Sequence, residues 1–169
     1  MKRIATLSDI DAILGIKSAA RQQYRTIGLV LPPTGAEARE LLRRHIAEGR
    51  TWVSLVEAEI AAYLIVERLE ESLHIEQVTV HPRYAGQRIG ASMINLAFEL
   101  AARQKLQKVT LTTFADVPWN GPYYQRLGFT IIPEERLTLR LKELLQAEKD
   151  SNRTGLARVA MTRSLIVPS

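Results

Sequence analysis

The segment HPRYAGQRIGASM, residues 81–93, contains the residues whose types and spacing point most directly to chemistry. Gly86 and Gly90 permit backbone conformations that other residues avoid, and they let a ligand approach the main chain closely. The first amides of a helix have no partner inside it and carry the positive end of its dipole. A glycine loop that opens a helix therefore predicts a phosphate or pyrophosphate site, with Arg83 and Arg88 adding positive charge.

The surroundings of these glycines favour this interpretation over a plain tight turn. The run IEQVTV (residues 75–80), rich in β-branched residues, precedes the loop, and apolar residues at helical spacing follow it. Two common nucleotide-binding patterns are excluded, because the loop has neither the Gly-Lys-Ser/Thr of a P-loop nor the Gly-x-Gly-x-x-Gly of a dinucleotide fold.

Composition excludes several other kinds of chemistry. The chain has 169 residues, 46% of them hydrophobic, which is the length of one domain with an adequate core. It has no cysteine, so a disulfide framework, a thiolate metal site and a cysteine nucleophile are excluded. The three histidines are too scattered to suggest a metal site. We expect a single domain over residues 1–169 and no bound metal.

Charge and hydropathy bound the location and the partners. Asp9 and Asp11 interrupt the stretch that a signal peptide would need, and the longest apolar run, residues 60–66, is too short for a membrane span. We therefore expect a cytoplasmic protein without a membrane partner. The net charge of +5 favours anionic partners, meaning nucleic acid, acidic peptides or a phosphorylated cofactor. The basic cluster over residues 38–50 is equally well explained as a solvated face, and nucleic acid is not the expected partner.

Hydrophobic periodicity and turn residues predict alternating strands and helices around one central strand–loop–helix–strand crossover, a mixed α/β arrangement. We expect a loop over residues 26–35 and a first helix that begins near Ser8, whose hydroxyl can cap it. The other expected helices cover residues 36–48, 88–105, 123–128 and 134–150. The expected strands cover residues 3–5, a hairpin over 51–69 that turns at Ala58-Glu59, and residues 72–80, 108–114, 129–132 and 157–167.

Two motifs resemble the GCN5-related N-acetyltransferase (GNAT) family. VTVHPRYAGQRIGASMI (residues 78–94) is similar to the family's acetyl-CoA pyrophosphate loop, Arg/Gln-x-x-Gly-x-Gly/Ala, and NGPYYQRLGF (residues 120–129) resembles its tyrosine four residues before a Gly-Phe pair. The order of elements matches over essentially all 169 residues. The resemblance implies a GNAT-like fold: a central twisted mixed sheet of about six to seven strands, flanked by helices, with a splayed central parallel pair.

Three positions depart from the family pattern. Ala85 stands where the family usually has Arg or Gln. This departure affects the expected affinity for the cofactor and not the identity of the cofactor. Arg88 replaces the middle glycine and adds a positive charge that would face a phosphate. Asn120 lies closer to the motif tyrosine than the asparagine common in the family.

The resemblance implies acetyl-CoA as co-substrate. Its pantetheine would pair with the main chain of Val78 and Val80, which are equally well explained as core strand residues, and the loop from Gly86 to Ala91 would hold the pyrophosphate. The cofactor-binding residues implied are Val78, Thr79, Val80, Ala85, Gly86, Gln87, Arg88, Ile89, Gly90, Ala91, Asn120 and Tyr124.

The resemblance also implies direct acyl transfer to an amine, with a backbone N–H near Val80 polarising the thioester. Tyr124 is the candidate general acid, because a phenol stays protonated at neutral pH and can protonate a departing thiolate. The alternative is that Tyr124 only packs on the cofactor. Glu76 or ordered water would accept the proton of the amine.

The acceptor pocket is expected from residues 24–33 and 114–120. Tyr24 and Trp119 could contact an ammonium through their rings, and Asp116 could pair with it, although each is also explained as a turn or core residue. The leading interpretation is an N-acetyltransferase acting on a primary amine of a small molecule or peptide. A non-catalytic CoA-binding sensor and a nucleic-acid-binding protein are the alternatives. A homodimer through the closing strands is consistent with the resemblance.

Overall fold

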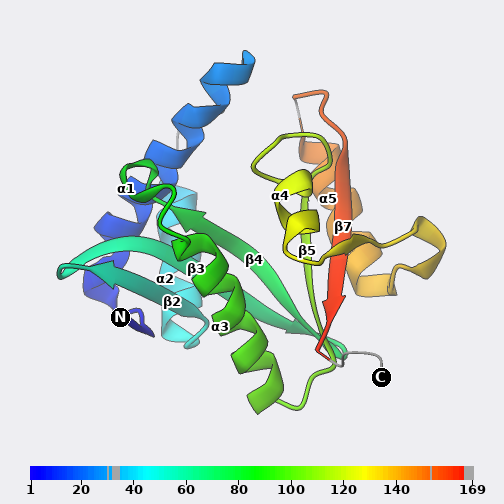
Figure 1. The fold of residues 1–169 in the computed structure, drawn as a ribbon, viewed down its shortest axis with the longest axis horizontal. Coiled ribbons are helices and arrows are strands. Elements are labelled where there is room, and N and C mark those ends of the chain that lie inside the picture. Colours follow the sequence, from blue (N-terminus) through cyan, green and yellow to red (C-terminus); the bar gives the residue numbers. More distant parts are fainter. Residues whose placement is uncertain (30, 32–34, 153, 166–169) are drawn as a thin grey trace. The chain divides into compact units, whose positions relative to one another are not determined.

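The structure, a computed structural model, describes residues 1–29, 31, 35–152 and 154–165. Strands and helices alternate along the chain (Figure 1). The strands are β1 (Lys2–Ile4), β2 (Thr51–Val56), β3 (Glu59–Leu69), β4 (Ser72–Val80), β5 (Lys108–Phe114), β6 (Thr130–Ile131) and β7 (Arg158–Ser164). The helices are α1 (Ile10–Arg21), α2 (Ala36–Ala47), α3 (Ile89–Arg103), α4 (Gly121–Arg126) and α5 (Leu139–Ser151), with short 3-10 helices η1 (Leu7–Asp9), η2 (Gln22–Ile27), η3 (Pro82–Tyr84) and η4 (Glu134–Arg136).

The strands form one mixed sheet of seven, in the order β1-β2-β3-β4-β5-β7-β6. β4 and β5 are parallel, and their register runs from Ser72 opposite Lys108 to Ile75 opposite Leu111. The pairs β1–β2, β2–β3, β5–β7 and β6–β7 are antiparallel. The predicted mixed α/β fold with a central parallel pair is confirmed.

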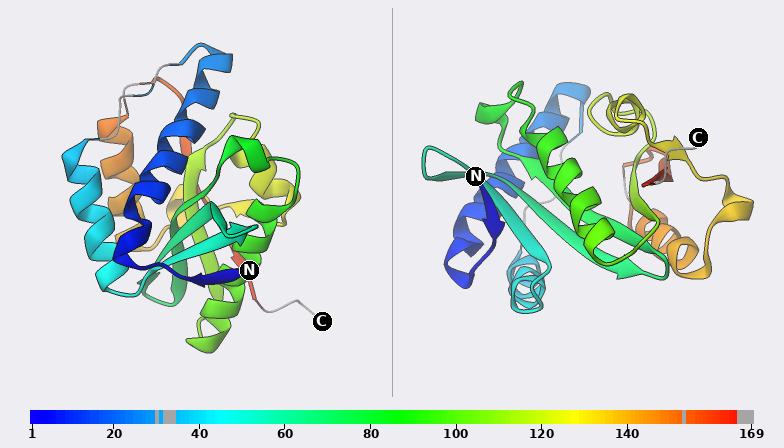
Figure 2. Two further views of the ribbon diagram at one scale, coloured as in Figure 1. Left: turned by 90° about the vertical axis from the view of Figure 1, so that its left-hand side faces the viewer. Right: turned by 60° about the horizontal axis from the view of Figure 1, so that its bottom comes forward.

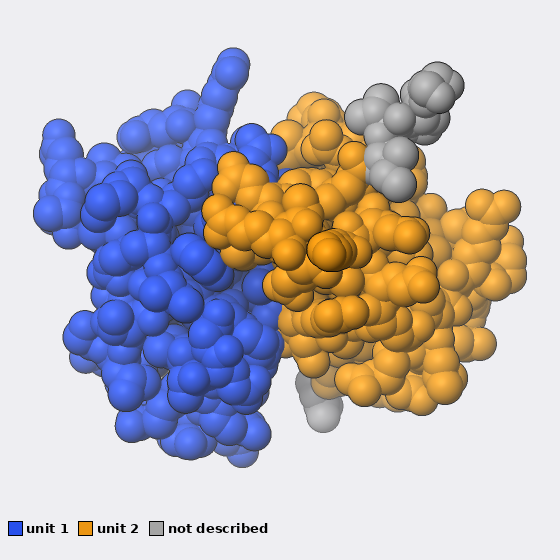
Figure 3. Space-filling view, turned by 90° about the horizontal axis from the view of Figure 1, so that it is seen from below, with its two compact units in different colours: residues 1–66, 77–96 blue, residues 67–76, 97–169 orange. Residues whose placement is uncertain are grey.

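The chain divides into two compact units, which Figure 3 colours separately. Unit 1 contains residues 1–66 and 77–96, and unit 2 contains residues 67–76 and 97–169. The single domain expected from the length stays a prediction.

The core of unit 1 lies where α1 and α2 pack on strands β2 and β3. Ile10, Ile13 and Ile16 follow one side of α1 at helical spacing, as the sequence predicts, and they are all buried. They pack in one cluster with residues of α2, β2 and β3, namely Leu42, Ile46, Val53, Tyr63 and Ile65. Figure 2 shows these helices and strands from two further sides.

The predicted cap of the first helix is wrong. Ser8 lies inside η1, and the capping residues are Thr6 and Asp9. The Asp9 carboxylate accepts a hydrogen bond from the Thr6 backbone N–H at 2.8 Å, and both its oxygens accept from the Arg3 guanidinium at 2.8 and 3.0 Å. The hydrogen bonds from Arg3 hold the pKa of Asp9 below its ordinary value. The Asp9 carboxylate therefore belongs to the capping box of η1, and its side chain makes no capping hydrogen bond to α1.

The turn of the first hairpin lies one residue earlier than predicted. Glu57 and Ala58 form it, with φ angles of 49° and 69°. Two successive residues with positive φ are typical of a type I′ turn, whose twist matches that of the flanking strands. Val56 is therefore paired with Glu59, which becomes the first residue of β3.

Unit 2 contains β5, β6 and β7, with α5 packed against them. β5 and β7 are paired over seven residues each, from Lys108 opposite Ser164 to Phe114 opposite Arg158. Leu141 and Leu145 of α5 are buried against Ala160 of β7. The helix expected over residues 134–150 begins only at Leu139, after a 3-10 turn. Residues 166 and 167 of the expected closing strand lie outside the described residues.

Over the described residues, no helix combines the length and the hydropathy that crossing a membrane requires.

A buried histidine lies in the core of unit 2. The His74 ring on β4 is 1% exposed, and its Nδ1 lies 2.9 Å from the Thr110 hydroxyl on β5. Burial disfavours the charged imidazolium and lowers the pKa of His74 to about 4. The ring is therefore neutral in the folded protein at neutral pH.

We expect His74 to weaken the fold in mild acid. Between about pH 6.5 and pH 4 the unfolded histidine binds a proton and the folded one does not, so the free energy of unfolding falls by on the order of 3 kcal/mol over this range. His74→Gln keeps a group that can hydrogen-bond Thr110 but does not titrate. Urea unfolding at about pH 7.5 and pH 4.5 should show a smaller acid loss for His74→Gln, and equal losses would contradict the assignment.

Candidate functional site

The glycine loop of unit 1 connects the end of β4 to the start of α3. Gly86 has a φ angle of +82° and Arg88 one of +59°, so the backbone enters the left-handed region twice before α3 begins at Ile89. Ser92 donates its backbone N–H to the Arg88 carbonyl at 3.1 Å. The amides of Ile89, Gly90 and Ala91 are thus in the first turn of a helix of 15 residues, where no carbonyl of the helix can accept from them.

Arg88 has a backbone conformation that normally favours glycine. The left-handed region costs a residue with a Cβ about 1–2 kcal/mol. Its side chain is exposed, as are those of Ala85 and Gln87. A guanidinium at the positive end of a helix dipole adds to a field that attracts an anion. The loop therefore combines helix-start amides that have no acceptor within the helix with positive charge, a combination suited to an anion.

A short 3-10 turn, η3, holds the base of this loop. The Tyr84 side chain is buried, and its hydroxyl donates to Oε2 of Glu59 at 2.8 Å. The Arg83 guanidinium lies 3.5 Å from the same carboxylate oxygen and 5.1 Å from the centre of the Tyr84 ring. The His81 side chain accepts from the Arg83 backbone N–H at 3.1 Å, and the hydrogen bond to Glu59 raises the pKa of Tyr84.

We call the contacts of Tyr84 and Arg83 with Glu59 the brace. It links the loop to the first residue of β3, and the sequence motif of the loop did not reveal it. Tyr84 was available as a signal, because a large aromatic residue in an otherwise small-residue loop needs a place to pack. Ala85 stands where the family pattern has Arg or Gln, and its methyl group cannot make a polar contact of this kind. The preceding residue, Tyr84, holds the loop instead through its hydrogen bond to Glu59.

The strand that precedes the loop presents alternating side chains. Gln77 receives a hydrogen bond from the Tyr63 hydroxyl at 2.7 Å, and Tyr63 belongs to the core cluster under α1 and α2. Thr79 lies on the same face two residues later, whereas Val78 and Val80 point to the other face. All four side chains are partly exposed.

In unit 2, Tyr124 lies on the short helix α4. Its ring contacts those of Tyr123 and Phe129, with centroid distances of 5.3 and 6.0 Å. Its backbone N–H donates to the Asn120 carbonyl at 3.0 Å. Tyr123 lies under the Arg126 guanidinium at 5.9 Å, and burial raises the pKa of its hydroxyl.

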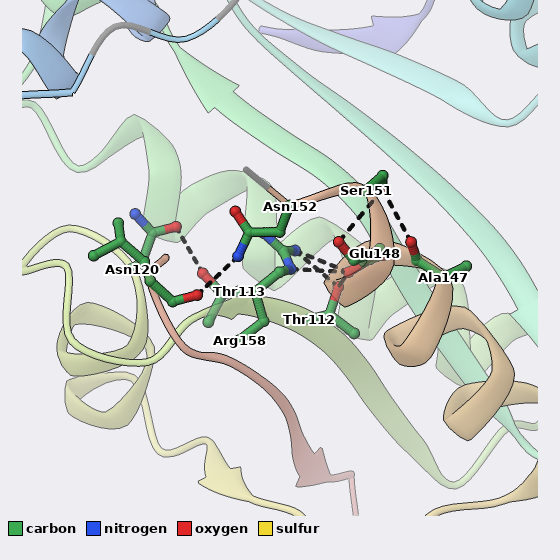
Figure 4. A network of polar contacts seen from close by, with 9 residues as sticks. Thr112, Thr113, Asn120, Ala147, Glu148, Ser151, Asn152 and Arg158 are labelled. Carbon is green, nitrogen blue, oxygen red and sulfur yellow. Dashed lines mark hydrogen bonds and ion pairs between the residues drawn. The ribbon is translucent and has the colours of Figure 1, made fainter. Parts of the chain in front are cut away.

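Asn120 precedes α4 and is tied to β5. Its Oδ1 accepts from the Thr113 hydroxyl at 2.6 Å (Figure 4). A second polar group next to it joins Thr112, Glu148 and Arg158, with an Arg158 nitrogen 2.9 Å from the Glu148 carboxylate. These contacts fix the ends of β5 and β7, and the Asn120 oxygen has a structural partner.

Gly121 allows α4 to approach β5 closely. A Cβ added there would overlap the Ala115 carbonyl oxygen and lie 3.1 Å from the Phe114 carbonyl oxygen. No side chain can give way, because both atoms belong to the backbone. The first residue of α4 therefore has to be glycine for the helix, and with it Tyr124, to keep this position.

The remaining predicted residues are found in both units. Glu76 follows the last residue of β4 that pairs with β5, and its side chain is partly exposed in unit 2. In the same unit Asp116 is exposed and Trp119 is partly buried. Tyr24 lies in η2 of unit 1. Residues 30 and 32–34 of the expected acceptor loops lie outside the described residues. Among those described, no three His, Asp or Glu side chains gather as metal ligands would.

The sequence matches the family model described as "Acetyltransferase (GNAT) family" over residues 18–129, about two thirds of the chain. The match includes the glycine loop, α3, Tyr124 and the Gly-Phe pair. The chain belongs to the GNAT acetyltransferase family. This membership supports acetyl-CoA-dependent acetyl transfer, and the predicted family is confirmed.

Solved structures show the same fold. One is N-acetylglutamate synthase from Neisseria gonorrhoeae complexed with coenzyme A and N-acetyl-glutamate, with a TM-score of 0.75 and 15% identity over 99% of this chain and 35% of that one. This GNAT chain thus spans about a third of that synthase. The PaiA N-acetyltransferase from Thermoplasma acidophilum, in complex with coenzyme A, has a TM-score of 0.71 and 10% identity over 97% and 98% of the two chains.

A third similar structure is the ribosomal-protein-S18-alanine N-acetyltransferase from Escherichia coli. It has a TM-score of 0.66 and 12% identity, and the similarity covers 100% of this GNAT chain and 96% of that one.

We expect Gly121→Ala to destabilise the GNAT fold by about 1–3 kcal/mol, because the added methyl group forces backbone to move. Gly15→Ala is the matched control. Gly15 lies in α1 with no atom within 4 Å of an added Cβ, so this variant should gain about 0.5–1 kcal/mol. Urea unfolding measures both. Equal stability of Gly121→Ala and the wild type would contradict the close approach.

Proposed function

We propose that the protein transfers an acetyl group from acetyl-CoA to a primary amine of a small molecule or peptide, by direct attack of the amine. The observation that carries the proposal is the loop in which Gly86 and Arg88 have positive φ and the first amides of α3 follow at once. In a member of this family, such a loop is suited to the pyrophosphate of coenzyme A.

In the proposed complex, the amides from Gly86 to Ala91 bind the pyrophosphate, and Ala85, Gln87 and Arg88 lie against it. The main chain of Val78, Thr79 and Val80 binds the pantetheine, as an added strand would. The Val80 N–H polarises the thioester carbonyl, and Asn120 contacts the coenzyme beside Tyr124.

The proposed reaction has one bond-forming and one bond-breaking event. The neutral amine nitrogen attacks the thioester carbonyl carbon, and collapse of the tetrahedral species breaks the carbon–sulfur bond. Tyr124 gives its phenolic proton to the departing thiolate, whose basicity is comparable. Glu76, or water that it holds, accepts the proton that the amine loses.

The acceptor is proposed from chemistry and from the similar structures together. The names of two of them specify an amino acid product, N-acetyl-glutamate, and a protein alanine as acetylated groups. Glutamate and alanine both carry their amine on the α-carbon, which is bonded to a carbonyl carbon, and this supports an acceptor of the amino acid or peptide kind here. Tyr24, Trp119 and Asp116 are proposed to contact it. A cytoplasmic location and a homodimer stay predictions.

We expect Tyr124→Phe to lower kcat by about a hundredfold or more, because the leaving thiolate loses its proton donor. The dissociation constant for acetyl-CoA should change little, since the ring remains. The measurement is thiol release with a panel of amines, combined with calorimetry for the coenzyme.

Tyr123→Phe is the matched control, because it removes a neighbouring hydroxyl from the same helix. Its turnover should stay within about threefold of the wild type. Unchanged turnover in Tyr124→Phe would reject the acid role. If the wild type binds coenzyme A but releases no thiol with any amine, the protein is a sensor and not a transferase.

A further inference from the structure

Two cations lie on the same side of the last turns of α1. Lys17 and Arg21 are four residues apart, so their Cβ atoms are about 5–6 Å from each other on one helix face. Ile13, one turn earlier on that face, is buried in the core of unit 1. Both cationic side chains are partly buried, and the Arg21 Nε is fully buried without a hydrogen-bond partner among the described residues.

A polar group of β3 and β4 lies near Arg21. The Tyr63 hydroxyl donates to the Gln77 side-chain oxygen at 2.7 Å and is hydrogen-bonded by Thr79. Because the Gln77 oxygen accepts from Tyr63, the amide nitrogen of Gln77 keeps its two N–H donors for another acceptor. The positive charge of Arg21 is close enough to act on the Tyr63 hydroxyl, whose pKa burial raises to about 12.

This arrangement of charges is unfavourable without an anion. Burial and then the nearby Arg21 charge lower the pKa of Lys17. Ion pairs within the described residues involve other cations, and none of them joins Lys17 or Arg21 to a carboxylate. Two like charges that are partly withdrawn from water cost free energy, which an anionic ligand between them would offset.

We propose that Lys17, Arg21 and the Gln77 amide bind an anionic oxygen group, a carboxylate or a phosphate, carried by the amine acceptor. The inference rests on the proposed transferase function and narrows the class of its substrate. Arg21 supplies a planar fork for two oxygens, Lys17 a mobile ammonium and Gln77 a neutral donor.

The position of Gln77 and Thr79 assigns this group to the acceptor. They alternate along β4 with Val78 and Val80, whose main chain is proposed to bind the pantetheine near its reactive end. An anion held here lies within a few residues of the thioester, whereas the phosphates of the coenzyme have the loop at residues 86–91. Arg21 and Lys17 are thus specificity residues for the acceptor and not for the coenzyme.

The experiment compares matched pairs of amines that differ in one anionic group. L-amino acids are paired with their carboxamides, and phosphoethanolamine with ethanolamine, in a thiol-release assay. Arg21→Gln should lower kcat/KM for the anionic member by about 10- to 100-fold and for the neutral member by less than about threefold. Arg21→Lys, which keeps the charge, should lose less. The pair with the larger effect identifies carboxylate or phosphate.

Two further measurements keep the outcomes distinct. Arg103→Gln removes an equal charge from an exposed position at the end of α3 and should leave both members unchanged. Calorimetry should give Arg21→Gln the wild-type affinity for coenzyme A. Equal losses for both members of each pair, or a tenfold weaker coenzyme affinity, would overturn the inference while the transferase function stands. If no amine is acetylated by the wild type, the proposed function fails and this inference fails with it.

Discussion

The proposed coenzyme site depends on a helix, α3, whose first amides have no carbonyl within the helix to accept from them. α3 starts directly after a loop that twice adopts positive φ, at Gly86 and at Arg88. The first N–H groups of α3 have no acceptor within the helix, so an anion at this helix start can accept from several at once. The positive φ of Arg88 is conformationally unfavourable. The contacts of Tyr84 and Arg83 with Glu59 stabilise the preceding part of the loop and help to offset this cost.

Each unit supplies a different kind of group to the proposed chemistry. Unit 1 contains the anion-binding loop, the β4 main chain and the two half-buried cations of α1. Unit 2 contains Tyr124, on a helix whose first residue can only be glycine because the backbone of residues 114 and 115 is in contact with it. In the proposed reaction, binding and orientation thus depend mainly on backbone groups, and proton transfer depends on one phenol. The proposed anion site would select the acceptor by charge.

The sequence predicted those parts that depend on local pattern. A run rich in β-branched residues identified the end of β4, the helical spacing of apolar residues identified α3, and Gly86 and Gly90 identified the loop. Boundaries that depend on a single competing group were wrong: Thr6 and Asp9, not Ser8, form the capping box of the 3-10 turn before the first helix, and the hairpin turns at Glu57 and Ala58. The Tyr84–Glu59 contact and the proposed grouping of Lys17, Arg21 and Gln77 join residues far apart in the chain, which periodicity does not reveal.

The most direct test is to map the backbone amides while coenzyme A is titrated into the isotope-labelled protein. The amide resonances of residues 86–91 should shift most, and calorimetry on the same sample should detect one site per chain. Inorganic pyrophosphate at higher concentration should move the same amides in the same direction. Binding that leaves these amides unmoved while others shift, or no heat with well-folded protein, would contradict the account.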